Sequence, residues 1–370
     1  MFEKLGSLFA GSGRIATIDA AKAAPPPSPL APIDLTDHAQ VAAVMDLAAR
    51  IGDILLSSGT SNSDTKAQIH AVTSAYGLHY CHVDITMNTI TIFTTIGHGR
   101  KTPVNVFRVV RSLTTDFSKL SEVDRLIRSI QAGATPPEVA EKILDELAAK
   151  PAEYGAWTAV MGWGVMGGAV AVMLGGGWLV ALTAFVTSVL IMAMNTWLGR
   201  NQLPLFFQNV FGGIVATVPA AVIYSLAAEL GFRISPSQII ASGIIVLLAG
   251  LTLVQSLQDG ITGAPVTASA RFFETLLFTG AIVAGVGIGI SLTALLGISL
   301  PPLETTAAPN FTSVTVRVIS GAVAAAGFAV ASYAEWSSVA ISALTALAGS
   351  GFYHFVLVPY GFGSVIAASV

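Results

Sequence analysis

Long apolar stretches separated by short polar breaks fill the second part of the chain. Residues 154–199 form a run of 46 residues without Asp, Glu, Lys or Arg, interrupted by glycines at 175–177. About 20 apolar residues cross a bilayer as a helix, so this run predicts two membrane spans joined by a tight turn. Five more stretches of span length follow, at 205–228, 237–257, 273–297, 313–334 and 338–358. The pattern therefore predicts about seven membrane-spanning helices.

The first 150 residues carry the pattern of a soluble domain. After the Pro-rich stretch 23–32, apolar residues recur at helical spacing, and then alternate over 79–96 with a phase slip at Asn88–Thr89 that predicts a turn between two strands. Asp37 is expected to cap the first helix and Thr135 the last. The predicted order is two helices, three strands and two helices, at 38–59, 61–77, two strands within 79–96, 104–110, 119–131 and 136–149.

Composition agrees with this division. The chain is 53% hydrophobic and 11% charged, against about 25% charged for a typical soluble protein. Of its 39 charged residues, 30 lie in the first 155 positions and nine in the remaining 215. The expected fold is a polytopic α-helical membrane protein with an N-terminal soluble α+β domain. Glycines at four-residue spacing predict close contacts between spans, at Gly164/Gly168 and Gly285/Gly289.

Charge and cysteine content narrow the range of partners. The net charge of −3 and the absence of a dense basic run argue against DNA or RNA as a partner. A single cysteine, Cys81, excludes an internal disulfide, and no metal or cofactor is expected. Of the 18 basic residues, 14 lie in the front section and Lys150 directly precedes the first span. The excess of Lys and Arg on the cytoplasmic side of membrane proteins therefore places the N-terminus in the cytoplasm.

Polar residues between the predicted fourth and fifth spans are the main candidates for a transport site. Charged residues within a membrane are costly and persist only for a functional or structural reason. Two glycines and a proline within 255–265 favour a broken or re-entrant backbone. The alternative is an ordinary cytoplasmic loop with Asp259 and Arg271 in solvent. The candidate pathway residues are Gln255, Ser256, Asp259, Gly260, Thr262, Arg271 and Glu274, with Gln208 and Asn209 at the start of the third span.

The front domain offers a second set of candidates, Ser58, His70, His82 and Asp84. Adjacent strand residues point to opposite faces, so Cys81 and His82 cannot form a dyad, whereas His82 and Asp84 share a face and could pair. The hydroxyl-rich stretch 57–65 is also what a helix end followed by a helix start requires. Neither a G-x-S-x-G elbow nor an H-E-x-x-H helix is present, so structural or regulatory roles are favoured over a hydrolase or a metal site.

Three stretches carry a family resemblance. They are ILLSSGTSNSDTKAQIHAVTSAYGLHYCHVDITMNTITIF in the front domain, LDELAAKPAEYG before the first span, and IIASGIIVLLAGLTLVQSLQDGITGAPVTASARFFETLLFTGAIVAGVGIGI through the fourth and fifth spans. Together they resemble the threonine/serine exporter (ThrE) family. The resemblance implies an inner-membrane carrier, not an enzyme, that expels threonine and serine and is driven by the proton motive force.

The family plan that the resemblance implies is a cytoplasmic domain followed by two related five-span units. On that plan the chain divides into a tether (1–37), a cytoplasmic α+β domain (38–152), a first five-span unit (153–298) and an incomplete second unit (299–370). Because the sequence ends inside what would be the eighth span, we expect an exporter that is incomplete through truncation of the gene product, a frameshift or division into subunits. Its missing spans would come from a complementing subunit, or the chain would form a homo-oligomer.

Given this resemblance, we expect an antiporter of amino acid and proton, with its site at the polar connection between the fourth and fifth spans. Arg271 or a helix N-terminus would bind the substrate carboxylate, and Asp259 or exposed carbonyls the ammonium group. The proton would be carried by Asp259 or Glu274. The β-hydroxyl would be bound by Gln255, Ser256 or Thr262. The alternative function is a membrane-anchored hydrolase or sensor that acts through the front domain.

Overall fold

The computed structural model describes residues 33–96, 101–110, 116–133, 135–151, 154–231, 234–248, 250–298, 300–301, 314–357 and 360. Most of the predicted tether and the last ten residues of the predicted second membrane unit lie outside these ranges. The described residues group into two compact units. The first holds residues of Met1–Glu153 and Gly250–Phe273, and the second holds residues of Tyr154–Ala249 and Glu274–Val370. The segment Gly250–Phe273, which the apolar pattern assigns to the membrane section, therefore groups with the front domain.

The first unit contains a three-stranded antiparallel sheet with the order β1-β2-β3. The strands are β1 (His82–Thr86), β2 (Thr89–Ile96) and β3 (Thr102–Val109). The chain turns between β1 and β2 at Met87 and Asn88, where Met87 has a positive φ of 49°. The turn predicted from the phase slip in the alternating pattern is confirmed.

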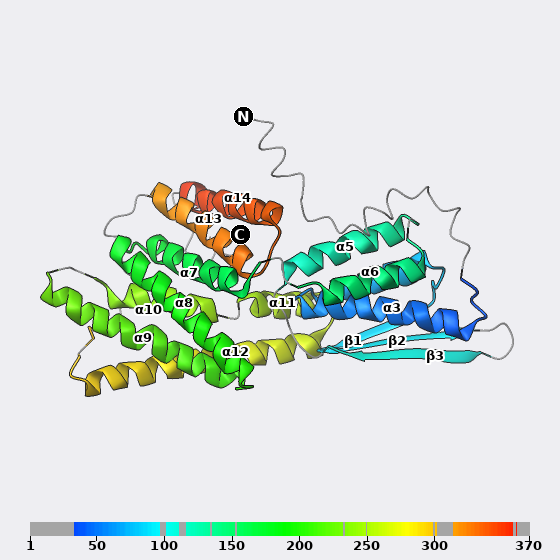
Figure 1. Ribbon diagram of the computed structural model, residues 1–370, viewed down its shortest axis with the longest axis horizontal. Helices are drawn as coiled ribbons and strands as arrows, with labels where there is room; N and C mark the ends of the chain where they lie inside the picture. The colour runs from blue at the N-terminus through cyan, green and yellow to red at the C-terminus, as the bar shows by residue number, and fades with distance from the viewer. Residues whose placement is uncertain are drawn as a thin grey trace, which may run out of the picture. The chain divides into compact units, whose positions relative to one another are not determined.

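Four helices form two layers on one face of this sheet (Figure 1). They are α3 (His38–Ser57), α4 (Asn62–Ala75), α5 (Phe117–Gln131) and α6 (Pro137–Ala149). Helices α3 and α4 contact the strands, and α5 and α6 pack on the other side of that helical layer. Apolar side chains between the layers form one core that includes Met45, Ile51, Ile69, Ile90 and Leu126. The predicted order of two helices, three strands and two helices is confirmed.

The predicted helix caps have mixed outcomes. Asp37 caps α3 by accepting a hydrogen bond from the Ala39 N–H at 2.8 Å, as expected. Thr135 does not cap α6, because Pro136 occupies the N-cap position and makes no side-chain cap bond. Thr135 is fully buried instead, and its hydroxyl lies 2.6 Å from the Ser129 hydroxyl. The prediction for Thr135 is wrong because that hydroxyl satisfies a buried partner rather than the helix end.

A helical hairpin completes the first unit. It consists of α11 (Gly250–Ile261) and the first part of α12 (Pro265–Leu295). Gly263 has a φ of 93° in the turn between them, and the Ala264 N–H donates to the Asp259 carbonyl at 2.8 Å. A positive φ just beyond a helix end is a common way to terminate a helix and satisfy its last carbonyls. Helix α12 thus starts eight residues before the predicted start of the fifth span at Phe273.

The second unit consists mainly of long apolar helices. Six helices of the described residues are long and apolar enough to cross a membrane, and the count rises to seven if the broken segment at 236–261 is one span. Helix α7 packs against α8 and α13, and α13 packs against α14. The helices of this unit, besides the remainder of α12, are α7 (Ala156–Met173), α8 (Trp178–Arg200), α9 (Leu205–Glu229), α10 (Pro236–Ile244), α13 (Val314–Ala331) and α14 (Trp336–Phe352), with the turns η1 (Ile245–Leu247) and η2 (Tyr353–Leu357).

The predicted fourth span, 237–257, is not one helix. Helix α10 tightens into the 3-10 turn η1, and Leu248 then adopts an extended ψ of 125° before α11 begins at Gly250. Every residue around this break is apolar or glycine, so hydropathy alone gave no sign of it. The helix of the predicted fourth span is therefore interrupted, and α10 with α11 forms at most one broken span. A broken backbone was expected a few residues later.

Glycines allow close contacts between helices of the second unit. A Cβ added to Gly285 of α12 would lie 2.1 Å from the Val210 carbonyl oxygen of α9, and one added to Gly289 would lie 2.7 Å from Thr217. A Cβ added to Gly168 of α7 would lie 3.1 Å from the Ala181 carbonyl oxygen of α8. The close contacts predicted from glycine spacing are confirmed, and they let backbones approach where apolar burial gives little driving force.

We expect Gly285→Ala to destabilise the protein, because its Cβ would overlap the Val210 carbonyl oxygen. Overpacking of this kind typically costs about 1–3 kcal/mol. The matched control is Gly287→Ala, since a Cβ there meets no atom within 4 Å. Thermal unfolding of the detergent-solubilised full chain should show a lower midpoint for Gly285→Ala and an unchanged or slightly higher midpoint for Gly287→Ala. Equal midpoints for the two variants would contradict the packing described here.

Candidate functional site: a buried polar network around Asp259

Asp259 is a fully buried carboxylate in the first unit. Its Oδ2 lies 3.0 Å from Nη1 of Arg271, whose side chain is 9% exposed. Its Oδ1 accepts a hydrogen bond from the Asn62 backbone N–H at 3.1 Å. The three residues come from α11, α12 and the first turn of α4, so one carboxylate joins both helices of the hairpin to the front domain.

Asn62 extends the network to the sheet. Its side-chain amide donates to the Ile85 carbonyl at 3.3 Å and to the Thr267 hydroxyl at 3.1 Å. Its Oδ1 accepts from Nη2 of Arg271 at 3.4 Å. The Met87 N–H donates to the same Thr267 hydroxyl at 3.2 Å. Strand β1, the β1–β2 turn, α4 and α12 therefore meet at two buried polar side chains.

A second set of contacts ties α11 to the start of α4. The Gln255 side-chain amide donates to the carbonyl of Gly59, which has a φ of 90° in the turn between α3 and α4. The Gln258 amide donates to the Asp64 carboxylate at 3.1 Å. Asp64 also accepts from the Ser61 hydroxyl at 2.7 Å, and Ser61 is the N-cap of α4. The hairpin thus contacts the cap of α4 as well as its first residue.

Polar contacts, rather than the apolar core, hold the hairpin to the front domain. The core cluster of the front domain, as far as the structure describes it, includes no residue of 250–273. A buried carboxylate or guanidinium without a partner would cost several kcal/mol, so each of these two charges requires the other. The attachment is therefore directional and depends on a small number of groups.

The predicted pathway residues divide between the two units. Asp259, Arg271 and Gln255 come together in the network. The Ser256 and Thr262 hydroxyls donate to carbonyls of their own helix, at Leu253 and Gln258. Gly260 is exposed on α11, and Glu274 is half-buried at the start of the second unit. Gln208 and Asn209 are buried on α9 of the second unit, where Gln208 donates to the Leu203 carbonyl at 2.6 Å.

Sequence reasoning missed Asn62, Thr267 and Gln258. Asn62 and its neighbours were interpreted as helix caps, and Ser61 does cap α4. No local pattern connects Asn62 with Asp259, because the two positions are 197 residues apart. The irregular polar segment around 255–274 was the one sequence signal for this network. It indicated the residues of the hairpin but not their partners in the front domain.

The front-domain candidates do not form a catalytic group among the described residues. Cys81 is buried, and burial raises the pKa of its thiol. His82 and Asp84 are exposed on one face of β1, as predicted, but Asp84 accepts from the Thr86 hydroxyl at 3.4 Å. Burial, together with the positive charge of Lys66 and His82, lowers the pKa of the half-buried His70. Ser58 is buried at the end of α3. Within the described ranges, no cluster of His, Cys, Asp and Glu could hold a metal ion.

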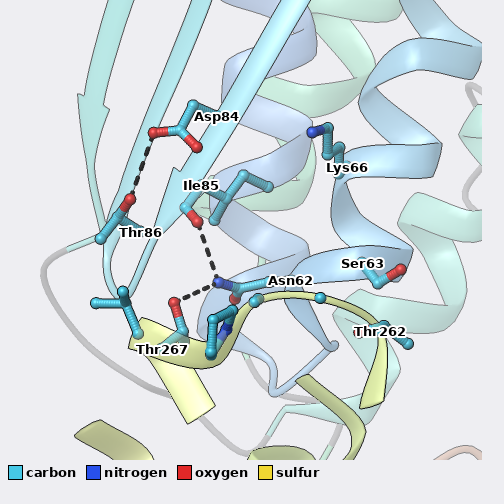
Figure 2. A pocket seen from close by; sticks show the side chains of 12 residues that line it. Asn62, Ser63, Lys66, Asp84, Ile85, Thr86, Thr262 and Thr267 are labelled. Carbon is cyan, nitrogen blue, oxygen red and sulfur yellow. Dashed lines mark hydrogen bonds between the residues drawn. The ribbon is translucent and has the colours of Figure 1, made fainter. Parts of the chain in front are cut away.

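A cleft of about 280 Å³ lies beside the network, between the hairpin and the front domain (Figure 2). Residues of α4, β1 and the α11–α12 turn line it. Asn62 and Thr267 belong both to the lining and to the network, so the cleft shares its wall with the contacts that hold the hairpin.

Comparison with known proteins identifies the family. Residues 46–293 match the model of the family ThrE, described as "Putative threonine/serine exporter". The chain belongs to the threonine/serine exporter family. This match includes every residue of the network, and the ThrE assignment makes the protein a transporter rather than an enzyme. The alternative of a membrane-anchored hydrolase is therefore not supported.

Two relatives support the ThrE assignment. The chain is 72% identical over 349 residues to "Threonine/serine exporter" of Corynebacterium glutamicum, covering 94% of this chain and 71% of that protein. It is 37% identical over 332 residues to "Probable threonine/serine exporter" of Mycobacterium tuberculosis, covering 88% of this chain and 61% of that protein. No solved structure matches the chain. The exporter family and the six described helices of span length make the chain a multi-pass membrane protein.

We expect Arg271→Gln to destabilise the first unit, because it leaves the Asp259 carboxylate buried without its ionic partner. Breaking a buried ion pair from one side typically costs about 3–5 kcal/mol. The double variant Asp259→Asn with Arg271→Gln should recover part of the loss, since it leaves no buried charge. The measurement is the thermal midpoint of the full chain in detergent.

The matched control for this comparison is Arg128→Gln. It breaks an exposed ion pair with Asp124, of 2.6 Å, within α5. Exposed pairs contribute at most about 1 kcal/mol, so this midpoint should barely move. If Arg271→Gln changes the midpoint as little as Arg128→Gln does, the buried pair does not stabilise the hairpin.

Proposed function

We propose that this protein exports threonine and serine across the plasma membrane by secondary transport driven by the proton motive force. The observation that carries the proposal is the 72% identity, over 94% of the chain, with a protein named as a threonine/serine exporter. Secondary carriers of this kind need several membrane-spanning helices and a polar group that responds to the coupling ion. The long apolar helices and the buried Asp259–Arg271 pair are consistent with both needs.

The front domain is proposed to lie in the cytoplasm. Most of the basic residues precede the first span, which favours this orientation. The grouping of Gly250–Phe273 with the front domain constrains the number of membrane crossings between the two segments. Both segments then lie on one side of the membrane, so the chain crosses an even number of times between them. Helices α7, α8 and α9 supply three crossings, so the fourth would fall to α10 and η1, because α11 lies with the front domain.

Asp259 is proposed as the group that carries the coupling proton. In its charged form it binds the Arg271 guanidinium and the Asn62 N–H. Protonation removes its charge, and with it the ionic partner of a buried guanidinium. The contact between hairpin and front domain then weakens, so the proton changes how firmly α11 and α12 are held. Export would alternate between the two states of this contact.

Substrate recognition by Arg271 and Asp259, as the sequence suggested, remains a proposal. Each of these groups binds the other in the structure, so a bound amino acid would have to replace that pair. Its carboxylate would bind Arg271 and its ammonium group Asp259, so two ion pairs would replace one and neither buried charge would be left unpaired. Gln208 and Asn209 of α9 and Glu274 of α12 would serve the path within the membrane section.

Asp259→Asn should abolish the response of export to the proton gradient, because an amide cannot take up and release the proton. The full chain is reconstituted in liposomes loaded with labelled threonine, and efflux is measured with and without a pH gradient. We expect gradient-driven efflux to fall at least about tenfold, whereas gradient-free exchange of threonine continues at a reduced rate.

Asp124→Asn, on the exposed face of α5, is the control for loss of a carboxylate. It should leave both rates at the wild-type level. Wild-type rate and pH dependence in Asp259→Asn would exclude Asp259 as the proton carrier. Absence of threonine efflux from the wild-type chain, in liposomes that hold a correctly folded protein, would contradict the proposed function itself.

A further inference from the structure

The lining of the cleft beside the network includes one residue of each charge. Lys66, one turn into α4, and Asp84, on the exposed face of the edge strand β1, both belong to its lining (Figure 2). No carboxylate of the described residues lies within 4.0 Å of the Lys66 ammonium group. Asp84 uses one oxygen for the Thr86 hydroxyl, at 3.4 Å. Both charges therefore retain the capacity to bind a ligand that carries the opposite charges.

Neutral hydrogen-bonding groups line the cleft between these charges. Ser63, Thr86 and Thr262 contribute hydroxyls. Val266 and Thr267 occupy the first turn of α12, and the N–H groups of a first helical turn have no acceptor within the helix. Such N–H groups, at the positive end of the helix dipole, favour a carboxylate. The lining can thus bind a hydroxyl, and the N–H groups at the start of α12 add to what Lys66 offers a carboxylate.

The wall of the cleft that contains Asn62 and Thr267 is held rigidly. Asn62 and Thr267 cannot turn away freely, because each is fixed by hydrogen bonds to two or more elements. Fixed polar walls lower the entropy cost of binding. The volume of about 280 Å³ is below the roughly 300–1,000 Å³ of pockets that hold drug-sized ligands. That size suits a single small polar molecule.

We propose that this cleft binds one small zwitterionic amino acid, whose carboxylate contacts Lys66 and whose ammonium group contacts Asp84. The hydroxyls of the lining would bind a side-chain hydroxyl. The identification of the ligand as threonine or serine rests on the proposed function. The site is separate from the Asp259–Arg271 pair, since it uses neither of those charges.

Occupancy of the cleft stabilises the attachment of the hairpin. One wall belongs to the front domain, and the other, formed by Thr262–Thr267, belongs to the hairpin. A ligand that contacts both walls adds binding energy only to the attached state, so it shifts the equilibrium toward that state. Bound amino acid thereby opposes the weakening of the attachment that protonation of Asp259 would cause. The attachment of the hairpin would then depend on the concentration of amino acid in the cytoplasm.

Hydrogen exchange of the full chain in lipid nanodiscs tests the site. L-threonine should slow amide exchange in peptides that cover 61–67, 82–87 and 262–268, and leave peptides of α6 unchanged. Lys66→Gln and Asp84→Asn should each raise the threonine concentration for half-maximal protection by about tenfold or more. Lys142→Gln and Glu138→Gln, exposed on α6, are the matched charge controls and should leave it at the wild-type value.

Ligand analogues assign each end of the amino acid. N-acetylthreonine lacks the ammonium group, so Asp84→Asn should not weaken its binding further. Threonine amide lacks the carboxylate, so Lys66→Gln should not weaken its binding further. Additional loss in either case would place the charges differently from the proposal.

The outcomes separate this proposal from the proposed function. If threonine protects no cleft peptide, or if Lys66→Gln and Asp84→Asn bind it as the wild type does, the site is refuted, even where liposomes still show export. If the cleft binds threonine but liposomes show no efflux, the site stands and the proposed function fails. If the site is correct, Lys66→Gln should also reduce the threonine dependence of hairpin protection in 250–261.

Discussion

A carboxylate with no access to water sets the main constraint on this molecule. Asp259 can remain charged in its buried position only if donors from several elements converge on it. Arg271 must come from the following helix and the Asn62 N–H from the start of α4. The turn at Gly263 brings α11 and α12 together, and the turn at Gly59 places the start of α4. The local geometry of four segments is therefore fixed by the requirements of one side chain.

The molecule uses three different kinds of contact in three places. The front domain is held by an apolar core between a sheet and two helical layers. The membrane helices have little to gain from apolar burial in lipid, and glycines such as Gly285 bring their backbones together instead. The hairpin is attached by a buried ion pair and directional hydrogen bonds. Apolar packing is hard to undo, whereas a contact made of a few titratable and polar groups is the natural place for a reversible change.

Local patterns predicted most of the fold, and they failed where non-local partners decided the outcome. Helical and alternating spacing located the elements of the front domain, and the length of apolar runs located the membrane helices. The break near Leu248 left no trace, because apolar residues and glycines stand on both sides of it. Thr135 has the residue type of a cap, but a buried hydroxyl partner at Ser129 determined its role. For the site, the polar segment around Asp259 was visible in the sequence, whereas Asn62 and Thr267 could be identified only from the three-dimensional contacts.

The donor that Asn62 offers to Asp259 belongs to the main chain, not to the side chain. Every amino acid except proline carries that N–H, so mutation at position 62 can remove the bonds to Ile85 and Thr267 but hardly the one to the carboxylate. At position 259 the reverse holds, because no other residue type of that length offers a charged acceptor. The donor and the acceptor of this hydrogen bond therefore differ in their sensitivity to mutation. Almost any substitution at position 62 keeps the donor, whereas almost any substitution at position 259 removes the charged acceptor.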